Sequence, residues 1–236
     1  MIPKKVHLSW KTKDLLDSKS PLVVHGIKRL VDLNPDWEVT IYDDQEVDDY
    51  LKTQLEPQVY NLIASKHIVQ KTDLWRLIKL YEEGGLYMDI DRFVDTPLND
   101  LVDENTKWVL PTYRDYDFSH DFMMTAPHNP AYRLAAQMYI ERLSQGHTSV
   151  YFLGPQTYMH AVTKILTGEM LNTDLGITAF DRVRDIIKNC GFIKTFREEP
   201  PYNTIVYRGE NLGLDWEQEK RRFYAESGLR HWSNEW

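Results

Sequence analysis

Two aspartates, Asp89 and Asp91, follow directly after the short apolar run Leu86–Met88. Because side chains in a strand alternate between its two faces, both carboxylates point to the same side where this run ends. Carboxylate oxygens in this arrangement suit a hard divalent cation such as Mg²⁺ or Mn²⁺. In a chain rich in aspartate the spacing also arises by chance, and a second pair, Asp115 and Asp117, lies in a polar, aromatic loop. The apolar run before it makes the first pair the candidate metal site.

A second pair able to do chemistry is Asp73 and Arg76, within the segment His67–Glu83, whose apolar residues recur at helical spacing. Gly84-Gly85 ends this predicted helix. Residues three positions apart lie about one turn apart on one helix face. The planar guanidinium group of arginine binds oxyanions through paired hydrogen bonds. An ordinary i,i+3 ion pair on the protein surface is the alternative interpretation.

The elements that position these residues are predicted from hydrophobic patterning. Strands are expected at Lys5–Trp10 and Trp37–Tyr42, which are rich in apolar, β-branched and aromatic residues. Between them, the apolar spacing over Leu22–Val31 indicates a helix that Asn34-Pro35 ends. Asp43-Asp44 then lies at the carboxyl end of the second strand, where open α/β sheets bind ligands. This alternation of strands and helices predicts an α/β fold with a largely parallel sheet.

The second half of the chain has weaker patterns. The further elements we expect are helices over Val47–Leu62, Ala131–Leu143 and Gln156–Leu166, and strands over Trp108–Pro111 and Phe122–Ala126. No internal repeat or linker divides the sequence. A chain of this length can bury roughly 70 % of its unfolded surface in one unit. We therefore predict a single domain over residues 1–236.

Composition restricts the class of protein. The chain has 28 Lys and Arg against 36 Asp and Glu, a net charge of −8, which argues against a large nucleic-acid surface because such surfaces need a basic excess. Cys190 is the single cysteine, so neither an intrachain disulfide nor a thiolate zinc cluster is expected. No run has the length of a signal peptide or a membrane span. We expect a cytoplasmic protein that does not bind nucleic acid.

The segment from Lys71 to Asp91 resembles the core of glycosyltransferase family 32. The shared features are an aspartate, an arginine three residues on, a Gly-Gly-x-Tyr and the acidic pair. The family includes fungal outer-chain mannosyltransferases, the glucosylating domains of large clostridial toxins, and bacterial and viral sugar transferases. The start Ile2–Trp10, the dipeptide Gly154-Pro155 and the end His231–Trp236 are similar to the family's first strand, later Gly-Pro turn and closing segment.

The resemblance implies a GT-A fold, which is Rossmann-like and binds a nucleotide-sugar together with Mn²⁺ or Mg²⁺. It implies catalytic roles for Asp73, Arg76, Asp89 and Asp91, and metal ligation by Asp89, Asp91 and His231. The residues implied to bind the donor are Trp10, Asp73, Arg76, Tyr87, Asp89, Asn234 and Trp236. Among these, Trp10 would stack on the nucleotide base and Tyr87 would line the donor pocket.

The expected reaction moves a sugar from a UDP- or GDP-sugar to a hydroxyl group of a glycan or protein. The family is retaining, which implies front-face attack without a dedicated protein base. Asp121 departs from the asparagine that family members more often have, and its role is left open.

Two other functions compete with this one. Haloacid-dehalogenase-like phosphohydrolases also end a strand in Asp-x-Asp and use magnesium, but they prefer Thr or Val where this chain has Phe93. A catalytically inactive module that binds glycans or nucleotides is the other alternative.

Several of the residues also have a purely structural interpretation. We expect Trp75 in the core, Trp10 either in the core or on the base, and His7 as a core histidine outside the catalytic set.

Overall fold

A computed structural model of the chain describes residues 1–13, 15, 21–94, 96–113, 117–168, 176–195, 206–207, 221–222 and 225. Its first half alternates strands and helices: β1 (Lys5–Ser9), α1 (Pro21–Leu33), β2 (Glu38–Tyr42), α2 (Asp44–Gln54), α3 (Pro57–Ile63), α4 (Ile68–Glu83) and β3 (Gly85–Met88). These elements follow the predicted ones closely. The exception is the single helix expected over Val47–Leu62, which is wrong. Pro57 begins a separate helix there, so α2 and α3 are distinct.

In the described part of the second half, the strands are shorter and four further helices follow. Its elements are β4 (Phe93–Val94), the 3₁₀ turn η1 (Leu98–Leu101), β5 (Trp108–Val109), β6 (Thr112–Tyr113), β7 (Asp117–Phe118), β8 (Phe122–Thr125), α5 (Pro130–Ser144), α6 (Val150–Leu153), α7 (Pro155–Thr167), α8 (Gly176–Asn189), β9 (Ile193–Lys194) and β10 (Val206–Tyr207). The two strands and two helices predicted here are present, although β5 ends two residues earlier than expected. Helix α8 was not predicted.

Six strands form the central sheet in the order β2-β1-β3-β8-β5-β9. Strand β1 is parallel to β2 and β3, whereas β8 is antiparallel to both of its neighbours, β3 and β5. Strand β9 is parallel to β5. The sheet is therefore mixed but mostly parallel, which confirms the predicted α/β class. Two small ladders, β4 with β10 and β6 with β7, lie outside it.

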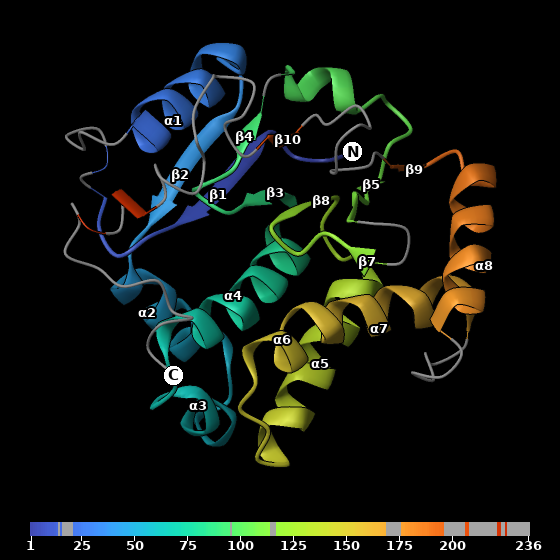
Figure 1. Ribbon diagram of the computed structural model, residues 1–236. Helices are drawn as coiled ribbons and strands as arrows, with labels where there is room; N and C mark the ends of the chain where they lie inside the picture. Colours follow the sequence, from blue (N-terminus) through green and yellow to red (C-terminus); the bar gives the residue numbers. More distant parts are fainter. Residues whose placement is uncertain are drawn as a thin grey trace.

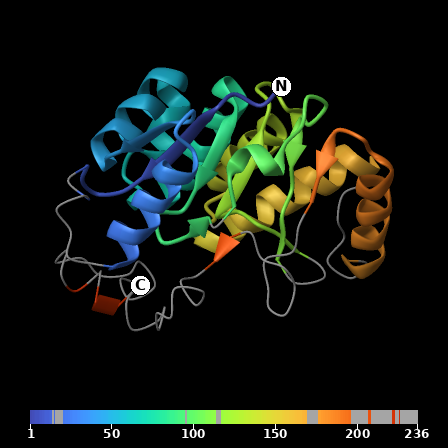
Figure 2. The ribbon, with the colours of Figure 1, turned by 90° about the horizontal axis from the view of Figure 1, so that it is seen from above.

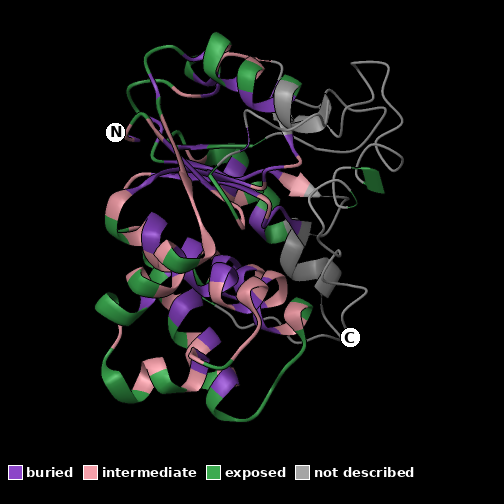
Figure 3. Ribbon diagram, turned by 90° about the vertical axis from the view of Figure 1, so that its left-hand side faces the viewer, coloured by how far each residue is buried: buried purple, intermediate pink, exposed green. Residues whose placement is uncertain are grey.

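Helices cover both faces of this sheet. Helix α1 lies over one face, and α4, α5 and α7 lie over the other, with α2 near the β2 end and α8 near the β9 end (Figures 1 and 2). Strand β3 shows how the two faces are filled. The core consists of two hydrophobic clusters, one under α1 and one under α4. Leu86 and Met88 pack in the first cluster, whereas Tyr87 packs in the second. Buried residues concentrate in the strands and on the inward sides of the helices (Figure 3).

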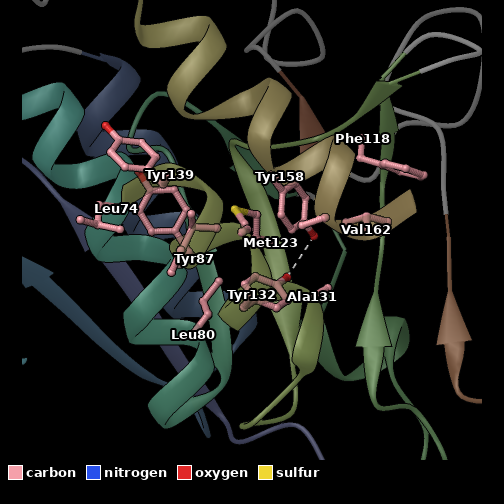
Figure 4. Close-up of a cluster of buried hydrophobic side chains, with 14 of the residues drawn as sticks. Leu74, Leu80, Tyr87, Phe118, Met123, Ala131, Tyr132, Tyr139, Tyr158 and Val162 are labelled. Carbon is pink, nitrogen blue, oxygen red and sulfur yellow. Dashed lines mark hydrogen bonds between the residues drawn. The ribbon is translucent and has the colours of Figure 1, made fainter. Parts of the chain in front are cut away.

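The larger cluster, on the α4 side, is rich in aromatic rings (Figure 4). Tyr132 of α5 and Tyr158 of α7 join their hydroxyl groups at 3.2 Å. Trp75 is fully buried in this cluster, as predicted. Among the described residues, no helix combines the length and apolar character needed to cross a membrane. The single domain and the cytoplasmic location stay predictions.

His7 is a buried histidine of β1, as expected. Its Nε2 lies 3.0 Å from the carbonyl oxygen of Gly84, so Nε2 carries the proton and donates it. Burial lowers the pKa of His7 to about 4. A protonated ring would add an N–H at Nδ1, for which the described residues offer no acceptor. The neutral ring therefore ties β1 to the junction of α4 and β3.

This pKa predicts acid sensitivity. The folded pKa of His7, about 4, lies below its ordinary value of 6.5, so its contribution to stability is complete above pH 6.5 and is lost as the pH falls toward 4. Between pH 7.5 and 5 the loss is about 2 kcal/mol. We expect His7→Gln to lack this part of the pH dependence in urea unfolding. Equal slopes for the wild type and the variant would contradict the assignment.

Candidate active site

The site lies where the parallel strands end. Strands β1 and β2 pair in register through Ser9 and Tyr42, and the amide of Trp10 donates to the carbonyl oxygen of Tyr42 at 2.9 Å. Strand β3 runs parallel beside β1, so Asp89, which follows it, lies at the same edge. Because β8 is antiparallel to β3, it begins at this edge, and the amide of Asp89 donates to the carbonyl oxygen of Asp121 at 2.9 Å. The sheet thus brings residues from distant parts of the chain together at one edge, the rim, where β1, β2 and β3 end and β8 begins.

Arg76 of α4 is the centre of the polar network at this rim. Its Nη2 lies 3.0 Å from Oδ1 of Asp73 and its Nη1 lies 3.4 Å from Oδ1 of Asp89. Nη1 also donates to the carbonyl oxygen of His120 at 2.7 Å, and the guanidinium group stacks over the ring of Tyr87 at 4.2 Å. The side chains of Arg76 and Asp73 are only 7 % and 4 % exposed. The alternative of an ordinary surface pair is therefore wrong.

Asp89 joins this network through two contacts, one with Arg76 and one with Tyr87. The hydroxyl group of Tyr87 donates to its Oδ1 at 2.6 Å. Burial raises the pKa of Tyr87 well above 10, so this donor stays protonated. Both contacts use Oδ1, and the described residues give Oδ2 no hydrogen bond or ion pair; the side chain is 36 % exposed. Oδ2 can therefore face an incoming cation.

The electrostatics of Asp89 fit that role. Burial raises the pKa of Asp89 to about 6, Arg76 opposes this rise, and the nearby charges of Asp121 and Asp91 add to it. A carboxylate held beside other carboxylates gains from a positive charge next to it. Asp91 itself is half-buried in the turn that follows β3.

Asp73 is buried beneath the network. Burial raises its pKa to about 7, against the opposing charge of Arg76. Its Oδ2 has no hydrogen-bond partner among the described residues. Gly154, at the junction of α6 and α7, lies directly against this carboxylate: a Cβ atom there would lie 2.8 Å from Cγ of Asp73 and 3.2 Å from Cε1 of His120. The Gly-Pro dipeptide singled out in the sequence thus packs on the Asp73 carboxylate.

Residues that sequence analysis missed complete the rim. His120 is buried, and burial together with Arg76 lowers its pKa well below 6.5, so the ring is neutral. Arg92 is also buried, and its Nε donates to Oδ2 of Asp121 at 2.7 Å. Arg92 and Asp121 are separated by 29 positions, so their pairing had no signal in residue spacing. The position of Arg92 directly after Asp91 was the one available indication.

The other predicted donor-binding and metal-binding residues are Trp10 and three residues near position 236. Trp10 is half-buried and packs against the core cluster under α1 while its backbone lies at the rim, so stacking on a base stays a prediction. His231, Asn234 and Trp236 lie outside the described residues. Asp43, at the end of β2, caps α2 through a reciprocal capping box with Glu46, which gives these two residues a structural role.

The donor set at the rim fits a hard divalent cation. Within the described ranges, no group of three or more His, Cys, Asp or Glu residues is placed to hold a metal ion. Mg²⁺ commonly binds through one or two carboxylates and takes its other ligands from water and substrate phosphates. Asp89 and Asp91 match that smaller set. Asp121 does not add to it, because Arg92 and Ser119 already occupy its two oxygens.

The fold and this rim define an α/β domain of the GT-A class. The PaToxG glycosyltransferase has the same fold, with a TM-score of 0.53 over 94 % of this chain and 83 % of that chain, at 18 % sequence identity. The GT-A fold predicted from the sequence is confirmed.

A family comparison covers the part of the chain that carries α4 and the acidic pair. Residues 20–108 match the family described as "Glycosyltransferase sugar-binding region containing DXD motif". This range contains Asp73, Arg76 and the Asp89–Asp91 pair, so the predicted resemblance to the DXD sugar transferases of glycosyltransferase family 32 is confirmed.

Curated relatives extend this finding. Inositol phosphoceramide mannosyltransferase 2 of Schizosaccharomyces pombe is 29 % identical over 138 residues, which are 58 % of this chain and 38 % of that protein. Mannosyl phosphorylinositol ceramide synthase CSH1 of Saccharomyces cerevisiae is 26 % identical over 132 residues, 55 % of this chain and 33 % of that protein. The aligned part therefore spans less than half of each relative.

The contact between Gly154 and Asp73 predicts a strict requirement for glycine. In Gly154→Ala the new methyl group overlaps the Asp73 carboxylate, which Arg76 holds in place. We expect a loss of roughly 1–3 kcal/mol in the free energy of unfolding, as in other overpacked interiors. Gly191→Ala is the matched control, because its Cβ would meet nothing within 4 Å. Equal stability of the two variants in urea unfolding would show that the close packing is not rigid.

Proposed function

We propose that this chain is a metal-dependent glycosyltransferase that transfers a hexose from a UDP- or GDP-sugar to an acceptor hydroxyl group. The observation that carries the proposal is the buried Arg76, which joins Asp73 and Asp89 at the carboxyl edge of a GT-A sheet. The match of residues 20–108 to the sugar-binding region of DXD glycosyltransferases supports it. The two relatives described above are named for mannosyl transfer to inositol phosphoceramide, so mannose is the first sugar to test.

In the proposed reaction the leaving group is a nucleoside diphosphate. A bound Mn²⁺ or Mg²⁺ would neutralise the negative charge that develops on it. Asp89 and Asp91 would hold that cation, with His231 as the predicted third ligand. Tyr87 and Arg76 fix Oδ1 of Asp89, so its other oxygen is oriented before the cation arrives. This preorganisation avoids reorientation of the carboxylate during the reaction.

Arg76 and Asp73 would act on the donor from beneath the rim. The positive charge of Arg76, held among Asp73, Asp89 and the carbonyl oxygen of His120, favours anionic groups of the donor. Asp73, which lies 3.0 Å from Arg76 and packs against Gly154, would hold that arginine in place beneath the donor. We name no general base, in line with the front-face, retaining reaction implied by the resemblance.

The acceptor is proposed at the level of chemical class. A glycan or protein hydroxyl group was expected from the sequence, and the names of the relatives add the inositol headgroup of a sphingolipid. The headgroup offers the same nucleophile, a sugar-like hydroxyl group. The phosphohydrolase alternative has less support, since residues 20–108 match the sugar-binding region of DXD glycosyltransferases and the fold resembles that of a solved glycosyltransferase.

The donor can be identified by ligand-dependent stabilisation. A ligand at 100 times its Kd raises the free energy of unfolding by about 2.7 kcal/mol. We expect one nucleotide-sugar among UDP-, GDP- and dTDP-hexoses to raise Tm in the presence of Mn²⁺ and much less without it. Absence of any Mn²⁺-dependent shift across the panel would contradict the proposed function.

Asp91 is the residue on which metal dependence should rest. Asp91→Ala should reduce Mn²⁺-dependent donor turnover to background with an unchanged circular dichroism spectrum, because the residue lies in a half-exposed turn. Asp100→Ala, at an exposed aspartate of η1, is the matched control and should retain activity. Wild-type turnover in Asp91→Ala would refute the metal site.

The C-terminal ligand has a separate test. Deleting residues 231–236 removes His231, Asn234 and Trp236 together and should weaken both Mn²⁺ and donor binding by tenfold or more, about the loss of one good ligand. Calorimetric titration of Mn²⁺ in the presence of UDP or GDP measures this. An unchanged titration would rule out the role given to His231.

A further inference from the structure

Asp121 holds both ends of the acidic turn that follows β3. Its carbonyl oxygen accepts the amide of Asp89 at 2.9 Å, and its carboxylate oxygen Oδ2 accepts Nε of Arg92 at 2.7 Å. A second guanidinium nitrogen of Arg92 contacts the same oxygen. The turn is closed from within, because the amide of Arg92 donates to the carbonyl oxygen of Asp89 at 3.0 Å. One residue thus fixes the entry and the exit of the segment that contains Asp91.

Asp121 is in turn held rigidly. Ser119 donates its hydroxyl group to Oδ1 of Asp121 at 2.5 Å, and the amide of Ser119 donates to the carbonyl oxygen of Pro111 at 3.0 Å. The amide of Phe122, the first residue of β8, donates to the same serine oxygen at 3.2 Å. Both carboxylate oxygens of Asp121 therefore already have protein partners. This is the arrangement of a supporting group, not of a ligand with an open oxygen.

Charge balance gives this support a second effect. Arg92 is buried, and a buried guanidinium group is costly without a paired carboxylate. Asp91 and Asp89 belong to the same turn as Arg92, whose amide donates to the carbonyl oxygen of Asp89. If the charge of Asp121 were removed, we expect the Arg92 side chain to turn toward these two carboxylates. Arg92 would then compete with a cation for them. In the proposed role, the pairing with Asp121 holds the Arg92 side chain so that it does not compete with the cation for these two residues.

We propose that Asp121, through its ion pair with Arg92, is a positioning residue that preforms the Asp89–Asp91 turn for a divalent cation. The inference rests on the proposed function, and it assigns a role to the aspartate that replaces the family's more frequent asparagine. An asparagine at this position could still accept a hydrogen bond from Arg92 but could not neutralise it. In this chain the cation affinity of the acidic turn is therefore expected to depend on the charge at position 121.

The test is direct titration with Mn²⁺ alone, followed by the electron paramagnetic resonance signal of the free ion. Asp121→Asn should weaken Mn²⁺ binding by about tenfold or more, the usual effect of losing a group that supports a metal ligand. The double variant Asp121→Asn with Arg92→Gln, which also removes the charge of Arg92, should recover affinity to within about threefold of the wild type. Asp36→Asn, which breaks the exposed pair with Lys4, is the matched control and should bind as the wild type does.

The outcomes separate this proposal from the proposed function. If the wild type binds Mn²⁺, Asp91→Ala abolishes binding and Asp121→Asn binds within twofold of the wild type, the positioning role is overturned while the metal site stands. A double variant that binds no better than Asp121→Asn overturns the competition by Arg92. If the wild type binds no Mn²⁺, the metal-dependent function fails and this proposal fails with it. If Asp121→Asn does not fold, Ser119→Ala provides a milder variant, because it removes one hydrogen bond to Asp121 and no charge. Unchanged Mn²⁺ affinity in Ser119→Ala would count against the positioning role of Asp121.

Discussion

The arrangement of the rim depends on the burial of one positive charge, that of Arg76. A guanidinium group removed from water is stable only among acceptors that replace its hydration. Here those acceptors come from three places: Asp73 on the same helix, Asp89 after β3, and the carbonyl oxygen of His120 before β8. Satisfying this one side chain therefore fixes the relative positions of α4, the end of β3 and the start of β8. The same contacts orient the carboxylates proposed to act on the donor.

The antiparallel pairing of β8 with β3 and β5 makes this arrangement around Arg76 possible. A parallel strand at the position of β8 would present its carboxyl end at the rim, and residues 119–121 would lie at the opposite edge. The antiparallel β8 instead places its beginning there, with Asp121 opposite Asp89. Positive and negative side chains then lie next to one another. Arg76 lies beside Asp73 and Asp89. Arg92 lies beside Asp121. Each arginine thus offsets part of the repulsion between the carboxylates of the rim.

Local patterns predicted the parts of this site that depend on local structure. The helix carrying Asp73 and Arg76 was predicted to within a residue, because its apolar spacing and its terminal glycines are both encoded nearby. The shared face of the two residues follows from the helical repeat alone. Their burial could not be predicted, since it depends on α6, α7 and the loop before β8. The Arg92–Asp121 pair depends likewise on strand order, which spacing along the chain does not encode.

The small ladder of β4 and β10 has a consequence for how the molecule is made. Val94, three residues after Asp91, pairs with Val206, so the two partners are separated by roughly 110 residues of chain, a long-range contact of the kind that forms slowly. During synthesis the sheet edge, α4 and the acidic turn emerge from the ribosome well before β10 does. The strand that continues from the turn therefore acquires its partner only after roughly 110 further residues have been synthesised. The turn is thus synthesised well before the last of the strands that pair beside it.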